Sequence, residues 1–189
     1  MTTYQHNEKG FTLVETLVAI LILSLTVGAL LTLAASGFFT IRYAKNDIVA
    51  NNLLQESLEF IRNNRDTTAQ QGRTWSDWKA SFPATCFEPE GCSVNVYASQ
   101  ATDRVFVCAN TPCYLSYFPD NGFYGYAGDN IFGSSMSGQE TSFVRTITMR
   151  ETTTTTDPEM IVTATMSWMN GLNTKKITQS IILSRWNLQ

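Results

Sequence analysis

The sequence predicts an α+β protein in which one very long N-terminal helix packs, through its second half, on a C-terminal antiparallel β-sheet. Three observations lead to this fold class: an apolar run over residues 11–39, a helical pattern that continues it to residue 66, and strict two-residue alternation near the C-terminus. The chain therefore divides into a leader, residues 1–10, the helix, residues 11–66, and a β-rich globular part, residues 67–189.

The apolar run is long enough to cross a membrane. Its 29 residues contain one charge, Glu15, and no proline. At about 1.5 Å per residue, such a helix exceeds the ~30 Å hydrocarbon core of a bilayer. A carboxylate costs roughly 2.5–3.5 kcal/mol at the centre of a membrane helix and less toward its end, so Glu15 is a candidate functional residue that needs a partner. The alternative is an interfacial acid that the helix dipole favours.

Two other interpretations of the run remain open. A secretory signal peptide would use Ala34-Ala35-Ser36 as its cleavage site, although Leu17 to Ala35 is longer than the usual apolar core of roughly 7–15 residues. A plain membrane anchor is the second interpretation. Basic residues do not decide the orientation, because Lys9 precedes the run and Arg42 and Lys45 follow it.

The amphipathic continuation has apolar or small residues at three- and four-residue steps. No proline or glycine interrupts it between Ile41 and Asp66, and Asn63-Asn64-Arg65-Asp66 is the expected exit. A continuous helix over residues 11–66 would be about 84 Å long, which is typical of a membrane or fibrous role. The stripe expected in the core is Ile41, Ala44, Ile48, Asn51, Leu54, Leu58 and Ile61.

The β-rich part begins after a loop-rich stretch in which Trp75 and Trp78 suggest one short helical turn. Strands are expected over residues 93–99, 104–108, 114–118 and 142–149. The clearest alternation covers residues 160–168, and Asn170-Gly171 then predicts a hairpin to a partner strand over residues 177–186. Residues 120–130 are rich in Gly, Asx and Tyr and are expected to form a loop of tight turns; a calcium site or a ligand-contacting loop is the alternative. Residues 152–156 suggest a hairpin tip.

Four cysteines, Cys86, Cys92, Cys108 and Cys113, suggest two disulfides in an exported domain. Three connectivities are possible. We favour two local loops, Cys86 to Cys92 and Cys108 to Cys113, because both intervening segments resemble tight turns. A four-cysteine zinc site is the alternative, although structural zinc sites favour closer pairs.

Composition argues against several function classes. The only histidine is His6, in the leader, so residues 11–189 hold none for Ser-His-Asp or Cys-His catalysis or for metal binding. The net charge is −3 and the 13 basic residues are scattered, which argues against a nucleic-acid surface. We therefore expect no enzyme, no cofactor and no metal site.

The segment from Lys9 to Val18, Lys-Gly-Phe-Thr-Leu-Val-Glu-Thr-Leu-Val, resembles the N-terminal signature of type IV pilins and pseudopilins. The resemblance is specific over roughly residues 9–40. It implies that a prepilin peptidase cuts between Gly10 and Phe11 and that Phe11 is then N-methylated. It also implies that Glu15 pairs with the Phe11 ammonium of a neighbouring pilin subunit.

The resemblance further implies a single-pass protein that lies in inner-membrane lipid, with its N-terminus in the cytoplasm, and later enters a pilus at the cell surface. Major pilins often carry a proline midway along the apolar helix, and this chain has none, which favours a minor pilin. A pseudopilin of a type II secretion or DNA-uptake system is one alternative. A membrane-anchored or secreted binding domain without a filament is the other.

Overall fold

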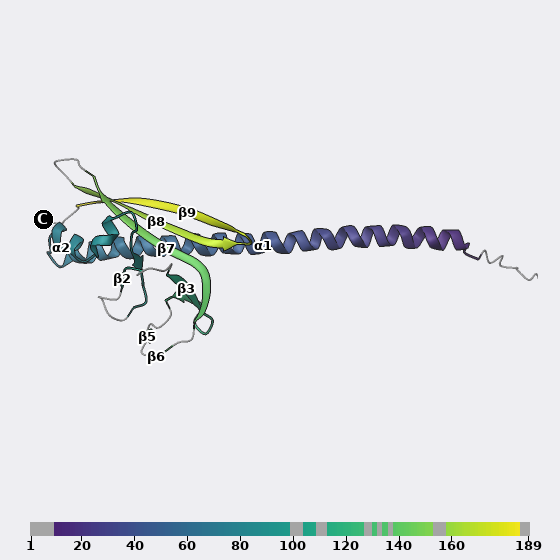
Figure 1. Ribbon diagram of the computed structural model, residues 1–189, viewed down its shortest axis with the longest axis horizontal. Coiled ribbons are helices and arrows are strands. Elements are labelled where there is room, and N and C mark those ends of the chain that lie inside the picture. The colour runs from purple at the N-terminus through teal and green to yellow at the C-terminus, as the bar shows by residue number, and fades with distance from the viewer. Residues whose placement is uncertain are drawn as a thin grey trace, which may run out of the picture. The chain divides into compact units, whose positions relative to one another are not determined.

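The computed structural model describes residues 10–98, 104–108, 113–126, 130–131, 134–135, 138–152 and 158–185. The chain forms two compact units, Met1–Lys45 and Asn46–Gln189, and the long helix α1 contributes to both. Figure 1 gives the order of the elements along the chain. These are α1 (Leu13–Gln70), α2 (Trp75–Ala80), the 3-10 helix η1 (Ala84–Phe87), β1 (Ser93–Val94), β2 (Val105–Phe106), β3 (Tyr114–Phe118), β4 (Phe123–Gly125), β5 (Asn130–Ile131), β6 (Ser134–Ser135), β7 (Gln139–Glu151), β8 (Glu159–Asn170) and β9 (Asn173–Ser184).

The main sheet is antiparallel and has the strand order β4-β3-β7-β8-β9. Its three long strands follow one another in sequence, and the β8–β9 hairpin closes at the pair Asn170 and Asn173. Gly171 in that turn has φ +66°, a conformation that glycine adopts without strain, so the Asn-Gly hairpin prediction is confirmed. Strands β1 and β2 and strands β5 and β6 form two small additional sheets.

The core of the Asn46–Gln189 unit lies between the second half of α1 and one face of the main sheet. Leu54 and Ile61 of α1 are fully buried, as are Ile147 of β7 and Met160 and Met166 of β8. In β8 every second residue from Met160 to Trp168 is buried, because alternate side chains of a strand point to the same face. The predicted α+β class, with a helix packed on an antiparallel sheet, is therefore confirmed.

The predicted apolar stripe of α1 was partly wrong. Ile41 and Ile48 are 64% and 61% exposed, and Ala44 is also exposed. A series of three- and four-residue steps fits several neighbouring helix faces, and only the partner sheet selects among them. The face that is buried comprises Ala50, Leu53, Leu54, Ser57, Leu58, Ile61 and Thr68.

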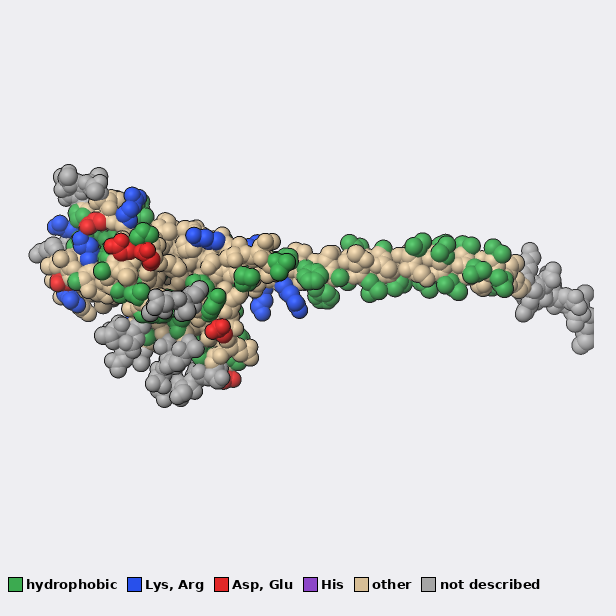
Figure 2. All heavy atoms as spheres, in the orientation of Figure 1, with side chains coloured by type: hydrophobic (Ala, Val, Ile, Leu, Met, Phe, Trp, Pro, Cys, Tyr) green, Lys and Arg blue, Asp and Glu red, His purple; other side chains and the backbone are tan. Residues whose placement is uncertain are grey.

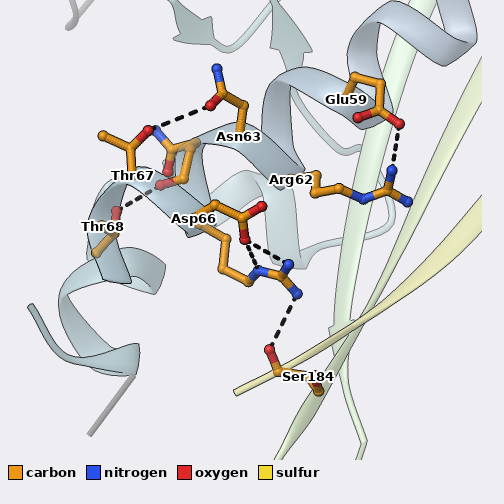
Figure 3. Close-up of polar contacts among 9 residues, drawn as sticks. Glu59, Arg62, Asn63, Asp66, Thr67, Thr68 and Ser184 are labelled. Atoms are coloured by element: carbon orange, nitrogen blue, oxygen red, sulfur yellow. Dashed lines mark hydrogen bonds and ion pairs between the residues drawn. The ribbon is translucent and has the colours of Figure 1, made fainter. Parts of the chain in front are cut away.

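The helix also ends at Gln70, four residues after the predicted exit at Asp66. Polar residues around the expected exit bond within the helix or to the sheet, as Figure 3 shows. The Thr68 hydroxyl donates to the Asn64 carbonyl, and Arg65 pairs with Asp66 at 2.6 Å and reaches the Ser184 carbonyl of β9. The helix is terminated by Gly72, whose φ of +66° is the left-handed conformation that glycine commonly adopts just after a helix end.

Strand boundaries differ from the predictions where tertiary pairing decides them. The strand predicted over 93–99 is only Ser93–Val94, and the predicted loop over 120–130 contains β4, which pairs with β3. Strand β7 is longer than predicted, and β9 begins at Asn173. Strand β3 and the helical turn at Trp75 match their predictions. Most of the hairpin tip predicted at 152–156 lies outside the described residues.

Candidate functional site: the N-terminal segment

The N-terminal segment begins in an open part of the chain. Gly10 is exposed, and a Cβ placed on it would meet no other atom within 4 Å. Phe11 is 80% exposed and precedes the first helical residue, Leu13. Nothing within the described chain therefore requires glycine at position 10. If glycine is required there, the requirement arises from a molecule that approaches this bond.

Thr12 caps the first turn of α1. Its hydroxyl accepts a hydrogen bond from the Glu15 N–H at 3.3 Å, and its carbonyl accepts from the Thr16 N–H at 3.2 Å. The sequence analysis missed this role, although Thr12-Leu13-Val14-Glu15 has the spacing of a capping box. The cap starts the helix directly after Phe11, so that Glu15 lies in the first turn.

The side chains of the following apolar run face outward. Leu25, Leu33 and Phe38 are each about 70% exposed, and the 18-residue window that qualifies as a membrane span has no residue buried within the structure. Figure 2 shows hydrophobic side chains along this part of the helix, with no charged side chain on the visible face until the blue groups near its globular end. A surface of this kind needs lipid or other apolar helices around it.

The hydroxyl side chains of the run are satisfied within the helix itself. Each donates to a backbone carbonyl three or four residues earlier, which removes the cost of an unpaired donor in an apolar layer. The donors are Thr16, Ser24, Thr26, Thr32, Ser36 and Thr40.

Glu15 differs from these hydroxyls. Its side chain is exposed, and within the described residues no basic side chain lies at ion-pair distance from it. Its carboxylate therefore stands out from a segment whose other polar groups are paired. The structure brings Gly10, Phe11 and Glu15 to one end of α1, within a stretch of six residues.

The cysteines lie elsewhere, in the Asn46–Gln189 unit. Cys86 is bonded to Cys92 and Cys108 to Cys113, with Cα atoms 4.7 and 5.6 Å apart, and these are the pairs that the short-loop argument favoured. The first loop is attached to β7 by two backbone hydrogen bonds between Cys92 and Ile147. Gly91 permits this approach, because a Cβ there would lie 2.5 Å from the Ile147 carbonyl oxygen.

A buried arginine fixes α1 to the strands. Arg145 of β7 is 1% exposed, and it donates to the carbonyls of Leu53 in α1 and Val94 in β1. Its Nη1 also lies 2.8 Å from the Glu56 carboxylate of α1. The sequence analysis did not identify this residue, because nothing in the local pattern distinguishes it from an outward-facing arginine on the same strand.

Residues 5–31 match the family model described as the prokaryotic N-terminal methylation motif. Comparisons with curated proteins and with solved structures gave no match. The matched segment contains Gly10, Phe11, the Thr12 cap and Glu15, and it covers most of the exposed apolar run. Together with the long helix packed on an antiparallel sheet, this match over the N-terminal segment supports a type IV pilin-like or pseudopilin-like protein.

Proposed function

We propose that the protein is a minor structural subunit of a type IV pilus or a pilus-like filament, and not an enzyme. The observation that carries the proposal is a lone carboxylate, Glu15, in the first turn of an exposed apolar helix that follows Gly10 and Phe11. Prepilin peptidase would cut between Gly10 and Phe11. The apolar helix would hold the subunit in the inner membrane and then pack among the helices of other subunits.

Glu15 would act through the charge at the new N-terminus. Cleavage leaves an α-ammonium on Phe11, and N-methylation keeps it cationic. One straight helix cannot easily fold its own terminus back onto a residue one turn further along, whereas the terminus of a neighbouring subunit can reach it. In an apolar layer, an ammonium without its carboxylate partner costs on the order of several kcal/mol.

The test is the variant Glu15→Leu, expressed in the native host. We expect membrane insertion and cleavage to be unchanged, because the substitution removes a charge from the apolar run. Incorporation should decrease about tenfold for every ~1.4 kcal/mol of pairing energy that is lost. Sheared-filament and membrane fractions measure this, and Glu59→Leu, the same change at an exposed position farther along α1, is the control.

Entry of Glu15→Leu into filaments at the parental level would refute the assembly role. Mass spectrometry of the mature N-terminus tests the family role separately, since a filament subunit should begin at N-methylated Phe11. A terminus near Ser36 would instead support a secreted domain. Recovery in sheared surface filaments favours a pilus, whereas retention in the cell envelope favours the pseudopilin alternative.

A further inference from the structure

A cavity on the Asn46–Gln189 unit has the features of a ligand site and is separate from the N-terminal segment. It lies between α1 and the β3–β4 hairpin and has a volume of about 440 Å³. This volume lies in the range of roughly 300–1,000 Å³ that is typical of ligand sites. Its lining consists of Val49, Asn52, Leu53, Glu56, Tyr97, Gly122, Phe123 and Tyr124.

Three half-buried aromatic rings, those of Tyr97, Phe123 and Tyr124, line the cavity, and each packs against a neighbouring ring. The Phe123 ring packs against Tyr97, at a centroid distance of 4.7 Å, and against Phe118, at 5.0 Å. Tyr124 packs edge-on against the buried Phe143. Because these rings support one another, a ligand would not have to order them, which reduces the entropic cost of binding.

Polar groups of the cavity come from α1. Glu56 contributes a partly exposed carboxylate, and Asn52 contributes an exposed amide one helical turn earlier. Glu56 is the only ionisable acid or base among the described lining residues besides the two tyrosines. Burial raises the pKa of Tyr97, and so do the charge of Glu56 and the hydrogen bond to it, so the Tyr97 hydroxyl stays protonated at neutral pH and donates to the Glu56 carboxylate.

The charge of Glu56 is already neutralised by the Arg145 guanidinium. Arg145 lies 2.8 Å from its carboxylate and is itself buried, so the local net charge is close to zero. A cationic ligand would gain little from this carboxylate and would approach a guanidinium. A neutral ligand with hydroxyl groups could donate to the carboxylate and the amide without desolvating an unpaired charge.

We propose that this cavity binds a neutral pyranose, one ring of a free or polymer-bound sugar. The C–H face of the ring would lie against Tyr97 and Phe123, because the face of an aromatic ring carries negative charge density. Its hydroxyls would bond to Glu56 and Asn52. Gly122, in the β3–β4 turn, also lines the cavity and has φ +69°. Because glycine has no side chain, only backbone atoms line the cavity at this position.

The experiment uses the full mature chain in a polyoxyethylene alkyl ether detergent, which contains neither sugar nor cation. Saturation-transfer NMR is recorded with the methyl glycosides of glucose, galactose, mannose and N-acetylglucosamine. At least one glycoside should receive saturation, most strongly at the protons of one ring face. Tyr97→Leu should weaken its binding by about tenfold, through loss of apolar contact.

Two further variants separate binding from folding. Asn52→Ala changes an exposed helical residue and should weaken binding about threefold to fivefold, through loss of one hydrogen bond. Tyr114→Leu removes an exposed tyrosine of β3 that is not among the cavity's lining residues, and should bind like the parent. If no glycoside receives saturation from the protein, the proposal is wrong. Equal binding of a glycoside by Asn52→Ala and by the parent would also overturn it. Displacement of a bound glycoside by tetramethylammonium chloride would also overturn it in favour of a cation site.

Discussion

Arg145 is the residue whose removal should damage the globular unit most. It joins three elements that are far apart in sequence: Leu53 and Glu56 of α1, Val94 of β1, and its own strand β7. Arg145→Met keeps most of the volume but removes one donor from each of two carbonyls and from the Glu56 carboxylate, although the Leu53 carbonyl keeps the Ser57 hydroxyl and Glu56 keeps Tyr97. Removal of one partner of a buried ion pair typically costs about 3–5 kcal/mol, and we expect that range here, because Glu56 is 22% exposed and the arginine only 1%.

The loss should be visible in thermal unfolding. For chains of 150–250 residues, 1 kcal/mol corresponds to a shift of roughly 2–4 °C, so Arg145→Met should lower Tm by about 6–20 °C. Near-ultraviolet circular dichroism of the detergent-solubilised full chain reports on the buried Trp75, Trp78 and Trp168. The control is Arg150→Met, the same change at an exposed position on β7.

The pairwise part of the effect can be isolated with a second substitution. Replacing both partners, Arg145→Met with Glu56→Leu, removes the stranded carboxylate and should recover part of the loss. If Arg145→Met unfolds within about 2 °C of the Arg150→Met control, the buried ion pair does not hold α1 to the strands. If the double variant is as unstable as the single one, the cost lies in the carbonyls of Leu53 and Val94 and not in the charge.

Three other predictions use different parts of the chain. Gly10→Val should block processing by the proposed peptidase, because a side chain at this open position would obstruct access to the bond that follows it; a normal mature mass for this variant would contradict the proposed cleavage site. Thiol labelling of the denatured, unreduced protein should find no free cysteine, whereas reduction should lower stability by roughly 2–3 kcal/mol or less for each short loop. Hydrogen bonds from Trp75 and Lys79 lower the pKa of Glu151 below 4.5, so its stabilising effect should be complete above that pH and lost as the pH falls through the lowered pKa. Glu151→Gln should flatten that part of the stability–pH curve.

Much of the fold could be predicted because its signals are local. The apolar run, the alternation in β8 and the Asn-Gly turn each depend on neighbouring residues only. The register of α1 on the sheet could not be predicted in this way. Ile48 belongs to the predicted stripe and is 61% exposed, whereas Leu53 lies outside that stripe and is 6% exposed, because the position of the sheet decides which face of the helix is covered.

The two candidate sites also differ in whether their signals are local in the sequence. Gly10, Phe11 and Glu15 lie within six residues of one another in sequence, so their motif could be recognised directly, and only the Thr12 cap was missed. The sugar-site proposal combines α1, residue Tyr97 and the β3–β4 hairpin. Tyr97 was expected in a strand, and β4 was expected to be part of a loop. Sequence reasoning could not bring those rings together, because their proximity depends on pairings between distant segments.

The polar residues of α1 show how one continuous helix serves two environments. From Thr16 to Thr40 its hydroxyl side chains donate back to the helix's own carbonyls. From Asp47 onward, longer polar side chains reach the strands: Asp47 to Lys175, Asn51 to Gln179, Glu56 to Arg145 and Arg65 to Ser184.

The change from hydroxyls bonded within the helix to side chains bonded to the strands falls beside the boundary between the two compact units, at Lys45 and Asn46. Short hydroxyl groups that bond within the helix suit a segment with apolar surroundings, since those surroundings need not supply a hydrogen-bond partner. Charged and amide groups with fixed partners on the strands suit a segment that keeps one position on its sheet. Within the described part of the apolar half, Glu15 alone follows neither rule, which is the reason to look for its partner on another subunit.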